Sequence, residues 1–152
     1  MSDTQKNSIL IVEDEQSIRD GLVELFDQPA NAITAAPMLP EALAALRAQT
    51  FELIVTDLRL GGKRDGGLQV MGLAGMLSPD ALVLVLTAFP DDDNKHASFR
   101  LGALHFLEKP IDLATIAALA AEHGIATALR PDVQPLPKGA KTKADADGPA
   151  KS

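Results

Sequence analysis

The sequence predicts an α/β protein in which a doubly wound, five-stranded parallel sheet carries helices on both faces. Short apolar runs alternate along the chain with stretches of helical periodicity. Two of these runs, residues 53–56 and 81–86, are unbroken, which is typical of strands covered on both faces. Parallel strands need crossover connections, and the intervening helices provide them in the usual right-handed sense.

Each expected strand is a short apolar or β-branched segment. In order along the chain, we expect strands at residues 8–12, 31–35, 53–56, 81–86 and 104–107. The first strand leads into Glu13, and the third is closed by Asp57. The second is the weakest of the five, and the fourth is the most hydrophobic segment of the chain.

Each expected helix shows an apolar stripe or a recognisable end. In order, we expect helices at residues 17–28, 40–49, 68–77, 95–101 and 113–123. Pro29 stops the first helix, Pro40 suits the first turn of the second, and Pro79 follows the end of the third. Gly102 ends the fourth helix, and Asp112 suits the N-cap of the fifth. The four glycines of residues 61–67 predict a flexible turn between the third strand and the third helix.

Composition predicts one folded domain with a tail. With 46% hydrophobic residues in 152, residues 1–130 are enough to bury a core. Residues 131–152 are rich in Pro, Ala, Lys and Asp and have almost nothing to bury, which predicts a disordered tail. Because no second folded domain is expected, the chain would act as a stand-alone module.

Charge and residue usage exclude several classes of function. A formal net charge of −7 and 3% aromatic residues argue against a surface that binds nucleic acid. The chain has no Cys, so it offers neither a disulfide framework nor a thiolate metal site. The longest apolar run, residues 81–86, is too short to span a bilayer. We therefore expect a cytoplasmic protein that contacts no membrane.

Three further features are interpreted as structural. The acidic run Asp91 to Asp93 is interpreted as a solvated loop and helix cap rather than a second metal site. The three histidines, His96, His105 and His123, share no metal-ligand spacing. The alanines of the last helix leave few bulky groups on its outer face, which suits either a good helix former or close approach by a partner helix.

Polar side chains gather where the expected strands end. Glu13 and Asp14 follow the first strand, Asp57 the third, Thr87 the fourth and Lys109 the fifth. In a doubly wound sheet these ends share one rim, where ligands bind. Carboxylates placed together repel one another, and a hard divalent cation such as Mg²⁺ relieves that repulsion. A cation, a nucleophilic carboxylate, a hydroxyl and an ammonium group together suit phosphoryl transfer.

The chain resembles the receiver domain of two-component response regulators over residues 7–130. The resemblance rests on four segments in receiver-like order and spacing: ILIVEDE, LIVTDLRL, VLVLTA and FLEKP. It implies a flavodoxin-like fold with the strand order 2-1-3-4-5. The chain departs from the common pattern in having Glu13 where Asp is usual, Phe106 where Tyr is frequent, and no Pro in the loop after Asp57.

The resemblance also implies a role for each residue of the rim. Asp57 would accept the phosphoryl group and, with Asp14, would ligate Mg²⁺. The backbone carbonyl of Arg59 would be a further ligand, and Glu13 would act directly or through water. Lys109 would pair with a phosphoryl oxygen. No organic cofactor is implied.

A switch is implied at the ends of the last two strands. Thr87 would turn its hydroxyl toward the phosphorylated acceptor, and Phe106 would move inward into the space vacated. Ala88 would leave room for the phosphoryl group, and the Lys109-Pro110 bond is commonly cis in the family.

The function implied is that of a single-domain response regulator phosphorylated by a sensor histidine kinase or a histidine phosphotransfer protein. It would catalyse its own phosphorylation and dephosphorylation without being an enzyme for a separate substrate. The signal would pass to a downstream effector protein, and a homodimer would form through the final helix.

Two alternative functions stay open: a pseudo-receiver that binds partners without phosphorylation, and a phosphorelay shuttle. A haloacid-dehalogenase-type phosphatase is disfavoured, because Arg59 stands where that family needs a second Asp.

Overall fold

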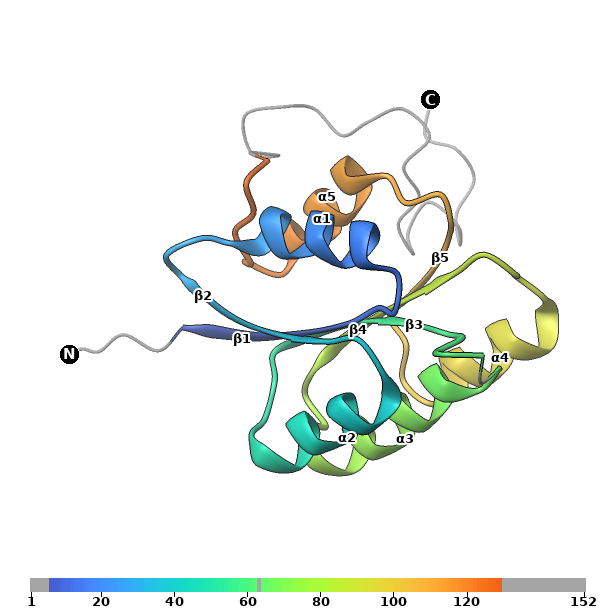
Figure 1. Cartoon of the computed structure of the whole chain (residues 1–152). Helices are drawn as coiled ribbons and strands as arrows, with labels where there is room; N and C mark the ends of the chain where they lie inside the picture. Colours follow the sequence, from blue (N-terminus) through green and yellow to red (C-terminus); the bar gives the residue numbers. More distant parts are fainter. Residues whose placement is uncertain (1–5, 63, 130–152) are drawn as a thin grey trace.

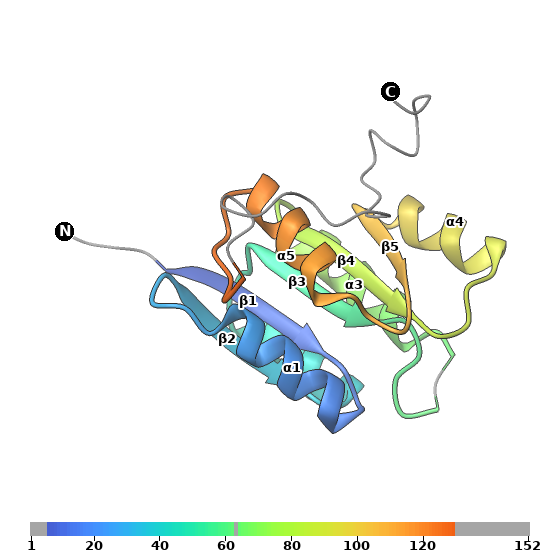
Figure 2. The ribbon, with the colours of Figure 1, turned by 90° about the horizontal axis from the view of Figure 1, so that it is seen from above.

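The computed structural model describes residues 6–62 and 64–129. Its strands form one parallel sheet in the order β2-β1-β3-β4-β5, which confirms the predicted doubly wound, flavodoxin-like topology (Figure 2). The strands are β1 (Asn7–Val12), β2 (Asn31–Ala36), β3 (Leu53–Asp57), β4 (Leu82–Thr87) and β5 (His105–Glu108). The helices are α1 (Gln16–Phe26), α2 (Leu39–Ala48), α3 (Gly66–Leu77), α4 (Asp92–Arg100) and α5 (Leu113–Glu122).

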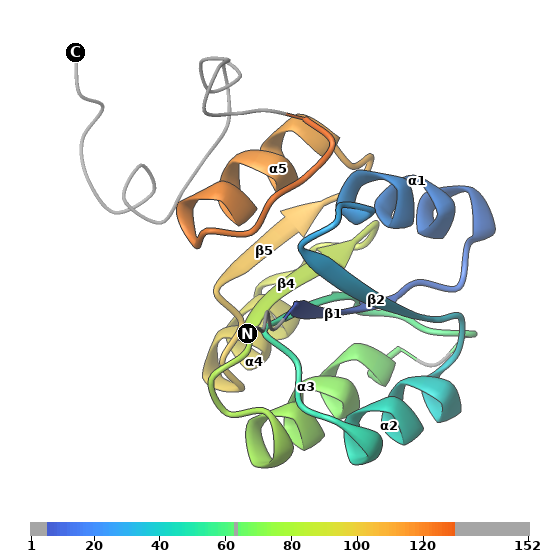
Figure 3. The ribbon, with the colours of Figure 1, turned by 90° about the vertical axis from the view of Figure 1, so that its left-hand side faces the viewer.

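The sheet is the middle of three layers. Helices α1 and α5 cover one face, and α2, α3 and α4 lie on the other (Figures 1 and 3). Alternate residues of β1 enter different cores: Ile9 and Ile11 pack under α1 and α5, whereas Leu10 and Val12 pack under α2 and α3. All five residues of β3 are buried, so the position of the last of them, Asp57, is set by packing on both faces.

Two helices begin more than one residue earlier than the sequence pattern predicts. Helix α3 begins at Gly66 rather than residue 68, and α4 begins at Asp92 rather than residue 95. The side chain of Asp91 accepts a hydrogen bond of 2.8 Å from the backbone N of Asn94, so the expected cap is confirmed. The expected loop is wrong, because Asp92 and Asp93 form the first turn of α4, where negative side chains favour the helix dipole.

Helix α5 corrects the reading of its alanines. Ala117, Ala118 and Ala120 are buried, Ala114 is half-buried, and Ala121 is exposed. Ala117 and Ala120 belong to the core beneath the helix, so the small side chains allow close packing against the sheet rather than leaving the outer face open. The predicted cap is confirmed, since the side chain of Asp112 accepts a hydrogen bond of 3.0 Å from the backbone N of Ala114.

Helix α3 approaches the end of β3 through a glycine. A Cβ atom placed on Gly67 would lie 2.4 Å from the carbonyl oxygen of Asp57 and 2.7 Å from Cα of Leu58. The backbone N of Gly67 donates to the carbonyl of Leu58 at 2.7 Å. Only a residue without a side chain fits this contact, so Gly67 helps to position the carboxyl end of β3.

Replacing Gly67 with Ala is therefore expected to lower the free energy of unfolding by about 2–3 kcal/mol, because backbone atoms must shift to accept the methyl group. Gly72 of the same helix is the matched control, since nothing lies within 4 Å of its added Cβ. Gly72→Ala is expected to raise stability by about 0.5–1 kcal/mol. Urea unfolding followed by circular dichroism measures both, and equal effects of the two substitutions would contradict this account of Gly67.

Two further expectations concern the tail of the chain and membrane-spanning helices. The predicted tail, residues 131–152, lies outside the described residues. Among the helices of residues 6–62 and 64–129, none is long and apolar enough to cross a membrane.

Candidate functional site

Asp57 and Lys109 meet at the carboxyl edge of the sheet. Asp57 is the last residue of β3 and is 5% exposed, and Lys109 follows β5 directly. The Nζ atom of Lys109 donates a hydrogen bond of 3.0 Å to Oδ2 of Asp57. The backbone N of Lys109 donates to the carbonyl of Thr87 at 2.7 Å, so the end of β4 helps to fix the lysine. The sequence prediction that these strand ends come together is confirmed in space.

Glu13 brings a second buried carboxylate to the same ammonium group. Its side chain is 0% exposed, and its Oε1 and Oε2 atoms lie 3.0 and 3.2 Å from Nζ of Lys109. Oε2 also accepts from the backbone N of Glu15 at 3.1 Å. Oε1 is buried and has no hydrogen bond to any described residue. Oε1 of Glu13 thus makes an ion pair with Lys109 but no hydrogen bond within the part of the chain that the structure describes.

Asp14 completes the acidic group from the exposed side. Its Oδ2 atom accepts a hydrogen bond of 3.0 Å from the backbone N of Gly61, in the loop after β3. Gly61 has φ +54°, a backbone conformation that favours glycine, and this turn directs its N–H toward Asp14. The backbone N of Arg59 donates to Oδ1 of Asp57 at 3.4 Å. The loop after β3 therefore contacts two of the three carboxylates.

Burial and mutual repulsion shift the pKa values of this group. Burial, together with the negative charge of Asp57, raises the pKa of Glu13 from 4.5 to about 7. Burial likewise raises the pKa of Asp57, although the hydrogen bond and positive charge of Lys109 oppose the shift. Burial alone would lower the pKa of Lys109, but its hydrogen bonds and charge pairing with Asp57 and Glu13 raise it overall. The site thus favours the charged form of Lys109 and disfavours ionisation of Glu13 and Asp57.

The metal-free protein is expected to lose stability as the pH rises from about 4.5 to 7. The raised pKa of Glu13 means that the folded state binds more protons than the unfolded state in this window. Its contribution is fully present below pH 4.5 and is lost through pH 7, an effect of up to about 3 kcal/mol. Urea unfolding across this pH range measures it. In Glu13→Gln the loss should shrink, and an unchanged pH profile in that variant would contradict the assignment to Glu13.

The three carboxylates fit a hard divalent cation. Glu13, Asp14 and Asp57 each offer an oxygen, and these oxygens lie within 4.8 Å of one another. Oε1 of Glu13 has no hydrogen bond to a described residue beside its ion pair with Lys109, and the pKa values of Glu13 and Asp57 are raised. A cation would relieve both features. Among the described residues, no other group of three or more His, Cys, Asp or Glu side chains meets the same criterion.

The residues expected to switch lie on the neighbouring strands β4 and β5. Thr87 is 1% exposed, and its Oγ1 accepts a hydrogen bond of 3.0 Å from the backbone N of Phe89. Phe106 is half-buried on β5, and its ring centroid lies 6.4 Å from that of Phe99 on α4. A cavity of about 190 Å³ adjoins Phe106 between β5 and the loop before α4. The Lys109-Pro110 bond is cis, as expected.

Two contacts at the rim were not predicted from the sequence. The guanidinium of Arg19 donates from Nη1 to the carbonyl of Glu13 at 3.0 Å, which holds the end of β1 against α1. The guanidinium carbon of Arg59 lies 4.4 Å from the centre of the Phe89 ring, a cation–π contact between two loops. Phe89 is 57% exposed. The sequence signal that could have drawn attention to it is a phenylalanine in the loop after the fourth expected strand.

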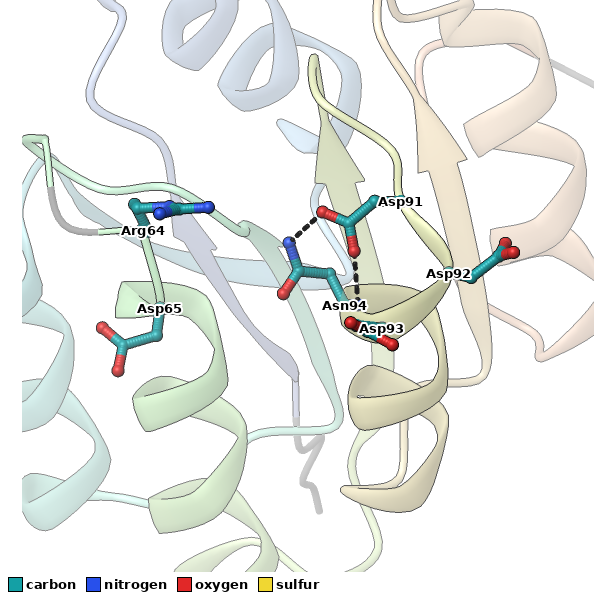
Figure 4. Close-up of a pocket in the computed structure, with 6 residues that line it drawn as sticks. All are labelled: Arg64, Asp65, Asp91, Asp92, Asp93 and Asn94. Carbon is teal, nitrogen blue, oxygen red and sulfur yellow. Dashed lines mark hydrogen bonds between the residues drawn. The ribbon is translucent and has the colours of Figure 1, made fainter.

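A cavity away from the carboxylate site lies on the side of α3 and α4. It has a volume of about 420 Å³ and opens between the loop before α3 and the start of α4. Figure 4 shows Asp91 bonded to Asn94 on one side, with Arg64 and Asp65 on the other. None of the predicted site residues lines this cavity. The chemistry of the rim therefore depends on the small acidic group rather than on a large pocket.

Comparison with known proteins identifies the family. A family model described as the response regulator receiver domain matches residues 9–121. The chain is a member of the response regulator receiver domain family. The response regulator protein PilR of Pseudomonas aeruginosa is 32% identical over 126 residues, covering 82% of this chain and 26% of PilR. FleR of the same organism is 28% identical over 117 residues, covering 77% of this chain and 24% of FleR. The chain thus spans about a quarter of the length of these relatives.

Solved receiver structures agree with this assignment. The non-phosphorylated HemR receiver domain of Leptospira biflexa has a TM-score of 0.68 and 30% identity, covering 82% of this chain and 97% of that one. A response regulator protein of Burkholderia pseudomallei has a TM-score of 0.66 and 28% identity, covering 78% and 74% of the two chains. That protein contains a phosphorylated aspartic acid and a calcium ion. Receiver domains are phosphoacceptors of two-component signalling that bind Mg²⁺ and interact with histidine kinases and effectors.

Proposed function

We propose that this receiver domain accepts a phosphoryl group on Asp57 from a sensor histidine kinase or a histidine phosphotransfer protein. The observation that carries the proposal is the arrangement around Asp57. Its carboxylate ends a strand buried on both faces, bonds Lys109 at 3.0 Å, and lies in one group with Glu13 and Asp14. A buried carboxylate with a paired ammonium and a neighbouring acidic cation site is suited to phosphoryl transfer.

Each residue of the site has a proposed role. Asp14, Asp57 and the carbonyl of Arg59 would hold Mg²⁺, with Glu13 binding directly or through water. When bound, the metal neutralises charge on the transferred phosphoryl oxygens. Lys109 keeps Asp57 ionised and is placed to pair with a phosphoryl oxygen. Because Lys109 already bonds Asp57 before transfer, its positive charge is in position when the negatively charged phosphoryl group reaches Asp57.

The proposed transfer step moves phosphorus from nitrogen to oxygen. A carboxylate oxygen of Asp57 forms a bond to the phosphorus of a phosphohistidine, while the phosphorus–nitrogen bond breaks. The electron pair of that bond returns to the imidazole nitrogen. Burial of Asp57 strengthens its interaction with Lys109, since fewer water molecules screen the two charges. The receiver catalyses this step on itself and needs no separate substrate.

The output is proposed to pass through Thr87 and Phe106. The Thr87 hydroxyl accepts a hydrogen bond from the backbone N of Phe89. A phosphoryl group on Asp57 would offer this hydroxyl a charged acceptor and therefore a stronger hydrogen bond. Its movement would leave space that Phe106 can enter from its half-buried position beside α4. An effector protein in the cytoplasm would bind the changed surface. A homodimer through α5 stays a prediction, and it would have to use exposed residues such as Leu113 and Ala121.

Intact mass spectrometry of the whole chain with acetyl phosphate tests the proposal. With Mg²⁺ the chain is expected to gain one phosphoryl group, and with EDTA in place of Mg²⁺ it is expected to gain none. A chain that binds Mg²⁺ but gains no phosphoryl group would favour the pseudo-receiver reading instead. Transfer onward to a phosphotransfer protein would identify the shuttle.

A further inference from the structure

Met38 packs on the loop that follows β3. It lies two residues after Ala36, the last residue of β2, and it is 43% exposed. A Cβ atom placed on Gly61 would lie 2.9 Å from Cε of Met38 and 3.4 Å from its Sδ. The thioether end of Met38 therefore contacts the backbone of Gly61 directly, while part of the methionine stays open to solvent.

Gly61 in turn orients one carboxylate of the acidic group. Its backbone N donates a hydrogen bond of 3.0 Å to Oδ2 of Asp14. Its φ of +54° belongs to a tight turn, so a small shift of this turn changes the direction of the N–H. One oxygen each of Asp14, Glu13 and Asp57 lie within 4.8 Å of one another. Hydrogen bonds to a metal-binding carboxylate orient it, and their loss weakens metal binding. Met38 is therefore one residue removed from a proposed metal ligand.

The three methionines of the described residues differ in exposure and surroundings. Met71 is 1% exposed in the core under α2 and α3, so an oxidant in solution does not reach it. Met76 is 76% exposed near the end of α3. Ser78, two residues later, accepts from the backbone N of Phe51 before β3 begins, so Met76 lies toward the opposite edge of the sheet from the acidic group. Of these three, Met38 alone combines solvent access with contact to the loop of the site.

We propose that Met38 is an oxidation site and that its sulfoxide, formed by hydrogen peroxide, weakens Mg²⁺ binding by the acidic group. The proposal rests on the proposed function, in which this group holds Mg²⁺, and it adds a redox control of that site. In the reaction, the thioether sulfur attacks one peroxide oxygen, a sulfur–oxygen bond forms and the oxygen–oxygen bond breaks. The sulfur is oxidised by two electrons. The peroxide is reduced, because the leaving hydroxide takes the proton of the transferred hydroxyl group and becomes water.

Oxidation changes the contact between Met38 and Gly61. A sulfoxide is polar, whereas the thioether that it replaces is apolar and flexible. Because Met38 is partly exposed, the sulfoxide can turn toward water and leave Gly61. The turn at Gly61 then loses a packing partner, and its hydrogen bond to Asp14 is held less firmly. Methionine sulfoxide reductase reverses the oxidation, so the effect is reversible.

The test treats the whole chain with hydrogen peroxide and compares the wild type with Met38→Leu and Met76→Leu. Peptide mapping by mass spectrometry locates the added oxygen, and isothermal titration calorimetry measures Mg²⁺ affinity. Oxidation of the wild type and of Met76→Leu should weaken Mg²⁺ binding about two- to tenfold, the range that follows from ~0.5–1.5 kcal/mol for one hydrogen bond at ~1.4 kcal/mol per tenfold. The affinity of Met38→Leu should not respond to peroxide, since leucine packs on Gly61 but is not oxidised. Treatment of the oxidised wild type with the reductase should restore its affinity.

A second measurement needs neither metal nor phosphorylation. In the metal-free wild type, the amide proton of Gly61 should exchange with water about two- to tenfold faster after oxidation, as expected for one weakened hydrogen bond. Nuclear magnetic resonance follows this proton, and its exchange in Met38→Leu should not respond to peroxide.

Unchanged Mg²⁺ affinity or unchanged Gly61 exchange in a chain fully oxidised at Met38 would overturn the proposal. An equal loss of affinity in Met38→Leu would also overturn it, because another residue would then carry the effect. Oxidation of Met38 that weakens Mg²⁺ binding in a chain that gains no phosphoryl group would keep the oxidation site and reject the phosphoacceptor.

Discussion

Replacing Asp57 with Asn is expected to abolish phosphorylation of the chain by acetyl phosphate and Mg²⁺. Asn retains the shape of the side chain but has no carboxylate to form an acyl phosphate. The substitution also removes a buried carboxyl group whose pKa is raised by burial. The free energy of unfolding of the metal-free variant should therefore be no lower than that of the wild type. Loss of phosphorylation would then reflect lost chemistry rather than unfolding.

Asp65→Asn is the matched control for this substitution. Asp65 lies in the loop before α3, is exposed, and makes no contact with Asp57 or Lys109 among the interactions described. Its variant should gain one phosphoryl group as the wild type does. Intact mass after incubation with the donor distinguishes the two variants. Phosphorylation of Asp57→Asn at the wild-type rate would place the acceptor elsewhere.

Replacing Lys109 with Met is expected to have the second largest effect. Without its ammonium, Glu13 and Asp57 are two buried carboxylates with no cation between them. The free energy of unfolding of the metal-free protein at pH 8 should fall by about 3 kcal/mol, as for other broken buried pairs. The phosphorylation rate should fall by about 10²- to 10³-fold, because a preorganised charge at the transferred group is lost.

The double variant Glu13→Gln with Lys109→Met separates the two effects. Neutralising Glu13 removes one of the unpaired charges, so part of the lost stability should return. The phosphorylation rate should stay low, since no ammonium is restored. Urea unfolding and the rate of mass gain measure these quantities. Wild-type stability of Lys109→Met at pH 8 would contradict the proposed electrostatic balance.

Much of the site could be predicted from the sequence because it depends on where strands end. The unbroken apolar run before Asp57 indicates a strand buried on both faces, and parallel topology then brings its end close to Glu13 and Lys109. Both steps need only local pattern and general topology. The helices between the strands and the carboxylate group are confirmed for the same reason, whereas the confirmed sheet order was implied by the resemblance to receiver domains.

Other features depend on packing that no local pattern reveals. Gly67 has no positive φ, and only the approach of α3 to the backbone of Asp57 shows why a glycine is needed there. Arg59 and Phe89 lie thirty positions apart in two loops, so their contact follows from strand pairing and loop conformation together. The alanines of α5 gave a misleading reading because small apolar residues fit an exposed face and a tightly packed one equally well.

The start of α4 shows a conflict between local signals. Three consecutive aspartates reduce the apolar periodicity that marks a helix, so the run from Asp91 to Asp93 looks like a loop. The same charges stabilise a helix N-terminus through the cap at Asp91 and the helix dipole. In the structure the capping effect prevails, and the helix begins three residues before its predicted start.

The most direct test of the central claim is to locate the phosphoryl group. Borohydride reduces an aspartyl phosphate to homoserine, which marks the acceptor permanently for peptide mapping by mass spectrometry. After treatment with acetyl phosphate and Mg²⁺, we expect homoserine at position 57 and at no other position. Homoserine at Asp14 or within Asp91 to Asp93, or no homoserine in a chain that binds Mg²⁺, would contradict the account.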